Sequence, residues 1–198
     1  KIFMILLKYL YEIKGERGSV AKTVSLTSMV NQYCEKHNIQ LFETAVGFKY
    51  IAKLMVEEKI LIGGEESGGL GTIVHIPERD GLFNGLMVLE VMAKRKMSLN
   101  ELCIELDNEF GVHRYSRRDI YVSEAQKNEI LNAAKNTPKE LGRIDVLSSD
   151  TTDGYKFFVN NGWLLIRASG TEPLIRFYAE SNSIESVNEL LDAGMKLK

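Results

Sequence analysis

Hydrophobic residues in the first 110 positions follow two alternating patterns. In some segments they recur every three or four positions, which is typical of amphipathic helices, whereas shorter segments rich in apolar and β-branched residues are typical of buried strands. The helical pattern covers 2–13, 28–37, 47–58, 80–96 and 98–110. The strand pattern covers 19–26, 39–44, 59–62 and 72–76. Alternating strands and helices predict βαβ units on a largely parallel sheet, where ligands bind at the carboxyl ends of the strands.

The pattern changes after Gly111. Strands are then predicted at 114–122, 143–147, 155–159, 163–166 and 174–178, and helices at 124–136 and 183–197. The segment Asn160-Asn161-Gly162 is typical of a tight turn between antiparallel strands. We therefore expect an α/β domain with a mixed, mostly parallel sheet at 1–107. An α+β domain with a mainly antiparallel sheet and two helices is expected at 108–198.

Composition narrows the classes of partner. The chain is 44% hydrophobic and 26% charged, as in soluble globular proteins, and its net charge of -2 offers no broad attraction to nucleic acid or anionic membranes. No apolar run is long enough to span a membrane, and the two cysteines lack metal-ligand spacing, which favours free thiols and a cytoplasmic location. The chain begins with Lys1 inside an amphipathic pattern, as a fragment of a longer polypeptide or a processed chain would.

One candidate site is the glycine-rich loop 63–69, which carries Glu65, Glu66 and Ser67. Its glycines allow a ligand to approach the backbone closely, and its carboxylates can accept hydrogen bonds from the vicinal hydroxyls of a sugar. The alternative is a solvated acidic loop. A metal site is disfavoured, because no Asp, His or third carboxylate is near in the sequence.

A second candidate site is the polar segment 167–173 between two apolar runs. It combines the guanidinium of Arg167, the hydroxyls of Ser169 and Thr171, and Gly170, which can adopt a positive φ. These groups can converge on a phosphate. The alternative is a hairpin turn whose hydroxyls satisfy only their own backbone. Arg176, in the following strand, is either a second phosphate ligand or a charge on the strand face.

Three segments in this order, 64–69, 75–81 and 167–173, resemble motifs of the α-D-phosphohexomutase family, which includes phosphoglucomutase and phosphomannomutase. The resemblance covers nearly the whole chain and corresponds to the third and fourth domains of that family. It implies that Glu65 and Ser67 recognise sugar hydroxyls. It also implies that Arg167, Ser169, Gly170 and Thr171 hold the phosphate that is not being transferred.

Two lysines are further candidates for contacts to the sugar, on the basis of shorter matches to the same family. Lys22 resembles a third-domain lysine near the substrate, although an exposed strand lysine is an equal alternative. The segment Gly47-Phe48-Lys49 resembles one where some relatives carry a substrate-contacting histidine. This chain has Phe48 at that position, so only Lys49 is expected to approach the sugar.

The resemblance also implies parts that this sequence does not contain. The family's phosphoserine loop belongs to its first domain and its aspartate-rich magnesium loop to its second, so no catalytic residue and no metal ligand is expected here. Those two domains of the same polypeptide are implied partners, together with hexose phosphates. Magnesium is the implied cofactor, and a hexose 1,6-bisphosphate the implied intermediate or activator.

The expected function is therefore the substrate-binding C-terminal half of an intramolecular phosphotransferase, an isomerase that interconverts hexose 1-phosphate and hexose 6-phosphate. The chain alone is expected to be inactive. Glu66 favours glucose or mannose, because glucosamine-type relatives resemble Gly-Glu-Gln-Ser-Gly-His at this loop. Two alternatives are a phosphoglucosamine or phosphopentose mutase and a stand-alone, non-catalytic module that binds sugar phosphates.

Overall fold

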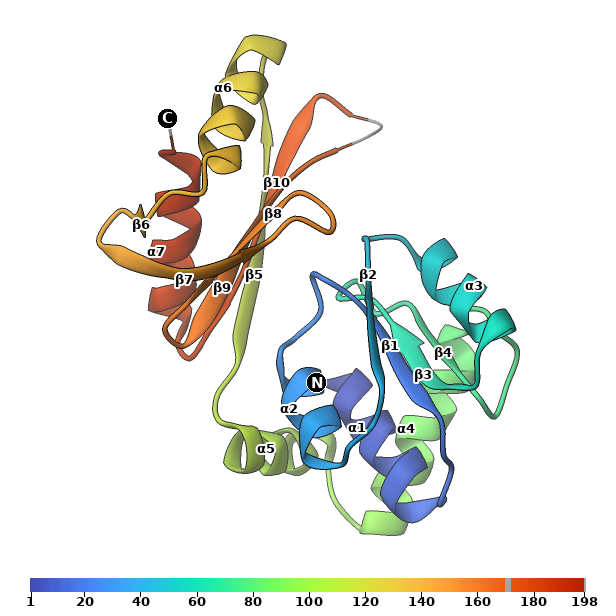
Figure 1. The fold of residues 1–198 in the computed structure, drawn as a ribbon. Coiled ribbons are helices and arrows are strands. Elements are labelled where there is room, and N and C mark those ends of the chain that lie inside the picture. Colours follow the sequence, from blue (N-terminus) through green and yellow to red (C-terminus); the bar gives the residue numbers. More distant parts are fainter. Residues whose placement is uncertain (170–171, 198) are drawn as a thin grey trace. The chain divides into compact units, whose positions relative to one another are not determined.

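A computed structural model describes residues 1–169 and 172–197, and the chain divides into two compact units, Lys1–Gly111 and Val112–Lys198 (Figure 1). The division falls slightly beyond the 107/108 boundary expected from the sequence. Helix α5 (Leu99–Phe110) continues past that point, and its Leu106 and Phe110 belong to the core of the first unit. The helix ends at Gly111, whose φ of 84° is readily adopted by glycine.

The first unit is built around a sheet whose strand order is β2-β1-β3-β4 in the described residues. Its strands are β1 (Ser19–Thr23), β2 (Leu41–Thr44), β3 (Ile60–Gly64) and β4 (Leu70–Thr72). Its other elements are α1 (Ile2–Lys8), the π-helical turn η1 (Tyr9–Ile13), α2 (Met29–Lys36), α3 (Phe48–Glu57), α4 (Gly81–Arg95) and α5. Strand β1 pairs in parallel with β2 and β3, and β4 is antiparallel to β3, which confirms the predicted mixed, mostly parallel sheet.

Strand β4 corrects the predicted strand at 72–76. The strand ends at Thr72, and one further hydrogen bond joins the Ile73 N–H to the Leu61 carbonyl of β3. The chain then turns, and the Thr72 carbonyl accepts a hydrogen bond from the His75 N–H. His75 Nε2 then lies 2.9 Å from Asp80 Oδ2, and the His75 ring stacks on Phe83. Asp80 in turn accepts the Phe83 N–H and caps α4. These contacts within the 75–81 motif and with Phe83 therefore stabilise the N-terminal end of α4.

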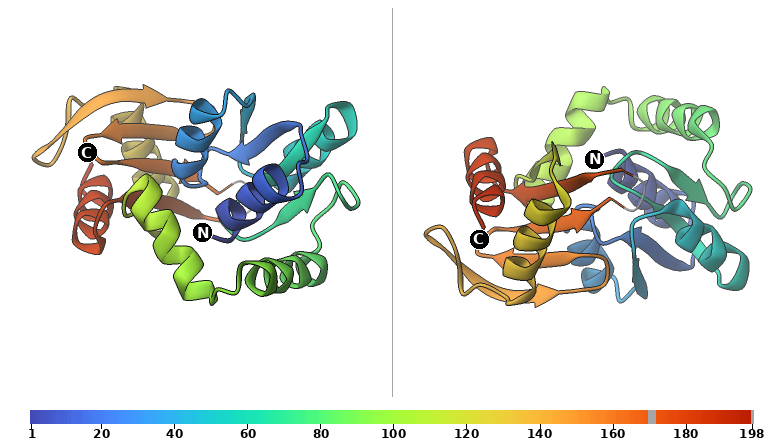
Figure 2. Two further views of the ribbon diagram at one scale, coloured as in Figure 1. Left: turned by 90° about the horizontal axis from the view of Figure 1, so that it is seen from below. Right: turned by 90° about the horizontal axis from the view of Figure 1, so that it is seen from above.

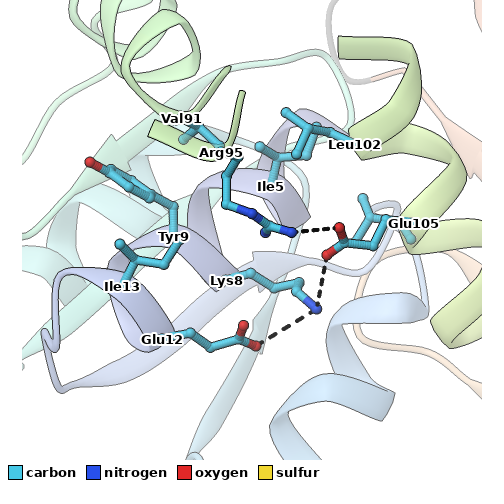
Figure 3. A pocket seen from close by; sticks show the side chains of 10 residues that line it. Ile5, Lys8, Tyr9, Glu12, Ile13, Val91, Arg95, Leu102 and Glu105 are labelled. Atoms are coloured by element: carbon cyan, nitrogen blue, oxygen red, sulfur yellow. Dashed lines mark hydrogen bonds and ion pairs between the residues drawn. The ribbon is translucent and has the colours of Figure 1, made fainter. Parts of the chain in front are cut away.

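Apolar side chains on the helices hold the first unit together. The larger core joins α1, α2, α4 and α5 to the sheet, and a smaller core forms beneath α3 around Ile51 and Phe48. Helix α3 packs closely on β3, because a Cβ on Gly63 would lie 2.4 Å from Ile51 Cγ2. Figure 3 shows a small hollow between α1, η1, α4 and α5, with ion pairs of Glu105 to Lys8 and Arg95 across its rim.

The second unit contains a sheet of order β5-β10-β9-β8-β7-β6 in the described residues, and its neighbouring strands are antiparallel. Its strands are β5 (Arg114–Tyr121), β6 (Glu140–Leu141), β7 (Ile144–Asp150), β8 (Tyr155–Val159), β9 (Gly162–Ala168) and β10 (Leu174–Ser181). Helices α6 (Glu124–Lys135) and α7 (Ile184–Met195) pack against it (Figures 1 and 2). The predicted α+β class is confirmed, and only the two-residue strand β6 had no counterpart in the sequence pattern.

No helix in residues 1–169 and 172–197 is long and apolar enough to cross a membrane. Both cysteines are free thiols. Burial raises the pKa of the Cys34 thiol to about 12, so this side chain behaves as a small apolar group of the core.

Candidate functional site

A first candidate site, in the first unit, lies where the parallel strands β1, β2 and β3 end. Because their carboxyl ends lie at one edge of the sheet, the loops that follow Thr23, Thr44 and Gly64 meet there. The β3–β4 loop is closed by a hydrogen bond from the Glu65 N–H to the Gly69 carbonyl. Gly64 is closely packed, because a Cβ there would lie 2.3 Å from Leu70 Cδ2 and 2.9 Å from Phe3 Cδ2, so a larger residue would require these side chains to shift.

Glu65 joins this loop to the start of α3. Its Oε1 accepts the N–H of Gly47 at 3.0 Å, and the residue is only 7% exposed. Gly47 precedes α3 with a φ of 136°, a conformation that favours glycine. Burial and the neighbouring Glu66 carboxylate raise the pKa of Glu65, although the Gly47 N–H and Arg79 oppose them. Glu65 was expected to bind the sugar, and one of its two carboxylate oxygens is thus already hydrogen-bonded to the protein itself.

The other two polar residues of the loop differ in exposure. Glu66 is half-buried, and its Oε2 accepts hydrogen bonds from Ser25 Oγ and, at 3.5 Å, from Thr23 Oγ1. Glu66 therefore anchors the loop to the end of β1. Ser67 is exposed at the tip of the loop, where it can meet a ligand.

Arg79 is a candidate that the sequence analysis missed. Its side chain lies over the loop, since a Cβ on Gly69 would be 2.6 Å from Arg79 Cδ. Its guanidinium lies 5.2 Å from the centre of the Phe48 ring, and its side chain is 57% exposed. The motif 75–81 drew attention to this segment, but no local pattern shows that Arg79 folds back over the loop.

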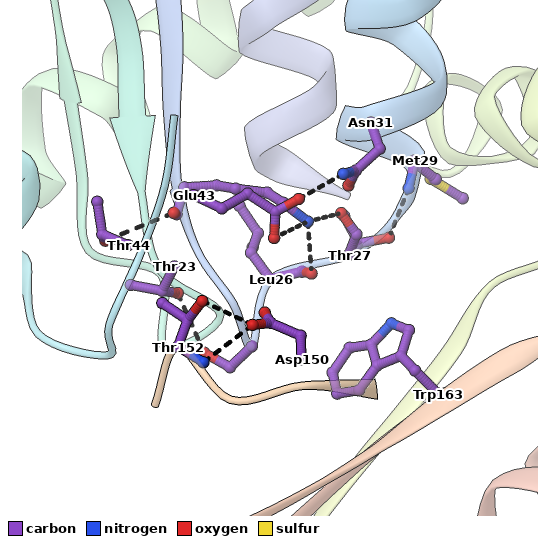
Figure 4. Close-up of polar contacts among 12 residues, drawn as sticks. Thr23, Leu26, Thr27, Met29, Asn31, Glu43, Thr44, Asp150, Thr152 and Trp163 are labelled. Atoms are coloured by element: carbon purple, nitrogen blue, oxygen red, sulfur yellow. Dashed lines mark hydrogen bonds and ion pairs between the residues drawn. The ribbon is translucent and has the colours of Figure 1, made fainter. Parts of the chain in front are cut away.

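The two lysines have different environments. Lys22 is 1% exposed, so the alternative of an exposed strand lysine is wrong. Its Nζ lies 3.4 Å from the carbonyl oxygens of both Leu26 and Thr27 and 3.7 Å from Glu43 Oε2, and Figure 4 shows these three residues together. Lys49 is exposed in the first turn of α3, and its ammonium lies 4.9 Å from the centre of the Tyr50 ring.

A second candidate site, in the second unit, is the hairpin between β9 and β10. The Ser169 N–H binds the Leu174 carbonyl, and Ser169 Oγ accepts the N–H of Glu172 at 3.2 Å. Ser169 is only 6% exposed, and its hydroxyl supports its own loop, as the turn alternative proposed. Gly170 and Thr171, which were expected to bind phosphate, lie outside the described residues.

Arg167 and Arg176 face each other across β9 and β10. Like charges in this arrangement repel, and each arginine has an anionic partner. Arg167 Nε donates to Asp153 Oδ2 at 2.7 Å. Arg176 pairs with Glu172 at 3.1 Å and with Asp119 at 3.7 Å. Burial lowers the pKa of Arg176, but Tyr178 and these two carboxylates outweigh it and leave the pKa raised.

An open hollow of about 340 Å³ adjoins Arg167. Its other lining residues include Thr151, Gly154 and Tyr155. A hollow beside a guanidinium provides room for an anion the size of a phosphate. Among residues 1–169 and 172–197, no group of three or more His, Cys, Asp and Glu side chains could hold a metal ion, so the described residues do not fit the implied magnesium.

The raised pKa of Glu65 has a consequence for stability. Because the folded state holds the Glu65 proton more tightly than the unfolded chain does, Glu65 lowers stability as pH rises from about 4.3 through its folded pKa. We expect Glu65→Gln to remove this loss. Urea unfolding across this pH range measures the free energy of unfolding of both proteins. Carboxylates with lowered pKa values, such as Asp80, change that free energy with pH equally in both, so the difference reports Glu65. Identical pH slopes for the two proteins would contradict this expectation.

Comparison with known proteins covers both units. Residues 1–110 match the family model "Phosphoglucomutase/phosphomannomutase, alpha/beta/alpha domain III", and residues 120–196 match "Phosphoglucomutase/phosphomannomutase, C-terminal domain". A phosphoglucomutase/phosphomannomutase of Thermococcus kodakarensis is 31% identical over 91% of this chain and 38% of its own length. A phosphoglucosamine mutase of Methanocaldococcus jannaschii is 28% identical over 100% of this chain and 42% of its own length.

A solved structure extends this similarity to the fold. The crystal structure of a Thermus thermophilus protein assigned as a phosphomannomutase has a TM-score of 0.81 and 31% identity, and the match covers 99% of this chain and 39% of that one. The chain thus spans about two fifths of the length of the relatives it matches. Since the two family models cover nearly the whole chain, it belongs to the α-D-phosphohexomutase family, with the sequence and fold of that family's third and fourth domains.

Proposed function

We propose that this chain is the substrate-binding C-terminal half of a phosphohexomutase that interconverts hexose 1-phosphate and hexose 6-phosphate through a bisphosphorylated sugar. The observation that carries the proposal is Arg167, a guanidinium held at the end of β9 beside a hollow of about 340 Å³. A fixed guanidinium with free N–H groups is suited to a phosphate. Because the chain belongs to the phosphohexomutase family, the phosphate is expected to be attached to a sugar.

In the first unit, Ser67 and Arg79 are the proposed contacts to the sugar, together with the second oxygen of Glu65. Ser67 is exposed at the loop tip, and Arg79 lies over the same loop. Glu65 Oε1 accepts a hydrogen bond from the Gly47 N–H, and its other carboxylate oxygen can accept one from a sugar hydroxyl. Lys22 is proposed as a support for the β1–α2 turn, and Lys49 as an exposed cation near the start of α3.

The sugar is proposed to be glucose or mannose. The expectation based on Glu66 is weakened, because this carboxylate is hydrogen-bonded to Ser25 and Thr23 and serves the loop. A phosphoglucosamine mutase is therefore a second candidate, and the name of the Methanocaldococcus jannaschii relative favours it. In either case the parent enzyme is an isomerase. Phosphoryl transfer, its magnesium and its phosphoserine are proposed to belong to the first and second domains, and hexose 1,6-bisphosphate is the proposed intermediate.

Calorimetric titration of the chain tests this proposal. The probes are inorganic phosphate, glucose 1-phosphate, mannose 1-phosphate and glucosamine 1-phosphate, with glucose as the control without a phosphate. We expect all phosphorylated probes to bind and glucose not to bind. Tighter binding of glucosamine 1-phosphate than of the other two sugars would favour the second candidate. Failure of every phosphorylated probe to bind would contradict the proposed function.

A further inference from the structure

We propose that Asp153 is a positioning residue for phosphate binding: it holds the Arg167 guanidinium by its Nε so that the Nη groups are left to grip the phosphate. This inference rests on the proposed function, because it concerns the arginine assigned to the phosphate. It starts from the 2.7 Å hydrogen bond between Arg167 Nε and Asp153 Oδ2. Both side chains are about 20% exposed, so the pair is partly shielded from water.

Asp153 lies in the turn between β7 and β8, and hydrogen bonds within this turn stabilise its conformation. Asp150 Oδ1 accepts hydrogen bonds from the Thr152 N–H at 2.9 Å and from Thr152 Oγ1 at 2.7 Å, a contact that Figure 4 shows. An aspartate that binds the backbone two residues ahead fixes a turn. The conformation of the residue next to Asp153 is therefore set by local hydrogen bonds and not by Arg167 alone.

Gly154 lets the same turn lie in close contact with Arg167, because it has no Cβ. Its φ is 87°, and a Cβ there would lie 2.4 Å from the Ile166 carbonyl oxygen and 3.1 Å from Arg167 Cα. The turn thus lies in direct contact with the β9 backbone at the root of the Arg167 side chain. Asp153 therefore approaches Arg167 from a turn that packs on β9, and the hollow lined by Thr151 and Tyr155 adjoins the same arginine.

The chemistry of the guanidinium makes this arrangement useful. Arginine has five N–H donors in a planar fork, and a bond to Nε alone leaves the four Nη–H donors for a second anion. An unsupported arginine loses side-chain rotamer freedom when it binds, and this loss weakens binding. Asp153 also balances the repulsion between Arg167 and the opposite Arg176 before a ligand arrives.

Repulsion between Asp153 and the phosphate acts in the opposite direction. If it dominated, Asp153 would be a competitor for Arg167, and its removal would tighten binding. Salt screens this repulsion only in part, because two anions on one guanidinium lie closer together than the Debye length, which is about 8 Å at physiological ionic strength. The two roles therefore give opposite results for the same variant, which makes the inference testable.

The test is calorimetric titration of inorganic phosphate and glucose 1-phosphate into the full chain at about 0.15 M salt, with hydrogen exchange of the Arg167 Nε–H followed by nuclear magnetic resonance. We expect Asp153→Ala to weaken binding about tenfold and to speed the exchange, because a charge-assisted hydrogen bond is lost. Asp153→Asn keeps an acceptor oxygen and should lie between the two proteins. Asp145→Ala removes an exposed carboxylate of β7 and should change neither readout.

The outcomes separate this inference from the proposed function. If the wild-type chain binds the probes and both Asp153 variants bind them equally well or more tightly, Asp153 is not a positioning residue and only this inference fails. Unchanged hydrogen exchange in Asp153→Ala would have the same meaning. If the wild-type chain binds neither probe, the proposed function fails and this inference fails with it. Asp153→Asn decides the question if the alanine variant does not fold.

Discussion

Replacement of Arg167 by alanine is expected to weaken phosphate binding by about a hundredfold, because loss of one partner of a hydrogen-bonded charge pair costs about 2–5 kcal/mol. The side chain lies at the end of β9, is held by Asp153 and lines the hollow that would accept the anion. Calorimetric titration of glucose 1-phosphate into both proteins measures the effect. The loss should be shared by inorganic phosphate, because Arg167 is assigned to the phosphate and not to the sugar.

Arg118 provides a matched control for this substitution. It is also an arginine of the second sheet with a carboxylate partner, but it pairs with Asp192 and Asn188 of α7. Arg118→Ala removes the same charge from the same unit and should leave phosphate affinity within about twofold, since long-range charge effects are screened. Equal losses in the Arg167 and Arg118 variants would show that the effect is general electrostatics and would contradict a phosphate clamp.

Replacement of Gly154 by alanine is expected to destabilise the second unit by about 2–5 kcal/mol. A left-handed backbone costs a residue with a Cβ about 1–2 kcal/mol, and overpacking adds about 1–3 kcal/mol. The clash is with backbone atoms, at 2.4 Å from the Ile166 carbonyl oxygen, so a rotamer change cannot relieve it. Urea unfolding followed by tryptophan fluorescence reports this unit, because the single tryptophan, Trp163, is buried in it.

Gly142 separates the two causes of that loss. Its φ is 68°, but a Cβ there would meet only Ala193 Cβ at an ordinary 3.7 Å. Gly142→Ala should therefore cost only the conformational strain, about 1–2 kcal/mol. If both alanine variants unfold at the same urea concentration, the turn is not pressed against β9, and the support proposed for Asp153 is absent.

Much of the fold could be predicted from the sequence because its local signals agree. The hydrophobic spacing of α4 begins at the capping residue Asp80, and α5 begins at Ser98, which forms a reciprocal pair of hydrogen bonds with Glu101. The turn at Asn161 and Gly162 joins β8 and β9 as expected. Strand β4 was misplaced because the chain turns just after Thr72, so that Val74 and Ile76 lie beyond the strand although their apolar side chains suggested its continuation.

The two candidate sites were less predictable, because the contacts within each unit join residues that are far apart in the sequence. Glu65 binds Gly47, and Arg167 binds Asp153 across a hairpin. A motif shows which residues are present, but it does not show that one carboxylate oxygen is already used by the protein. The burial of Lys22 likewise depends on its position in β1, next to Glu43 in the parallel strand β2.

The most direct test of the proposed division of labour is to measure binding and turnover on the same sample of this chain. Glucose 1-phosphate and mannose 1-phosphate are titrated by calorimetry, and formation of the 6-phosphates is followed with magnesium and glucose 1,6-bisphosphate present. We expect binding that is weakened by Arg167→Ala, and no turnover. Turnover by this chain, or a failure to bind either sugar phosphate, would contradict the proposal that it holds the substrate while other domains transfer the phosphate.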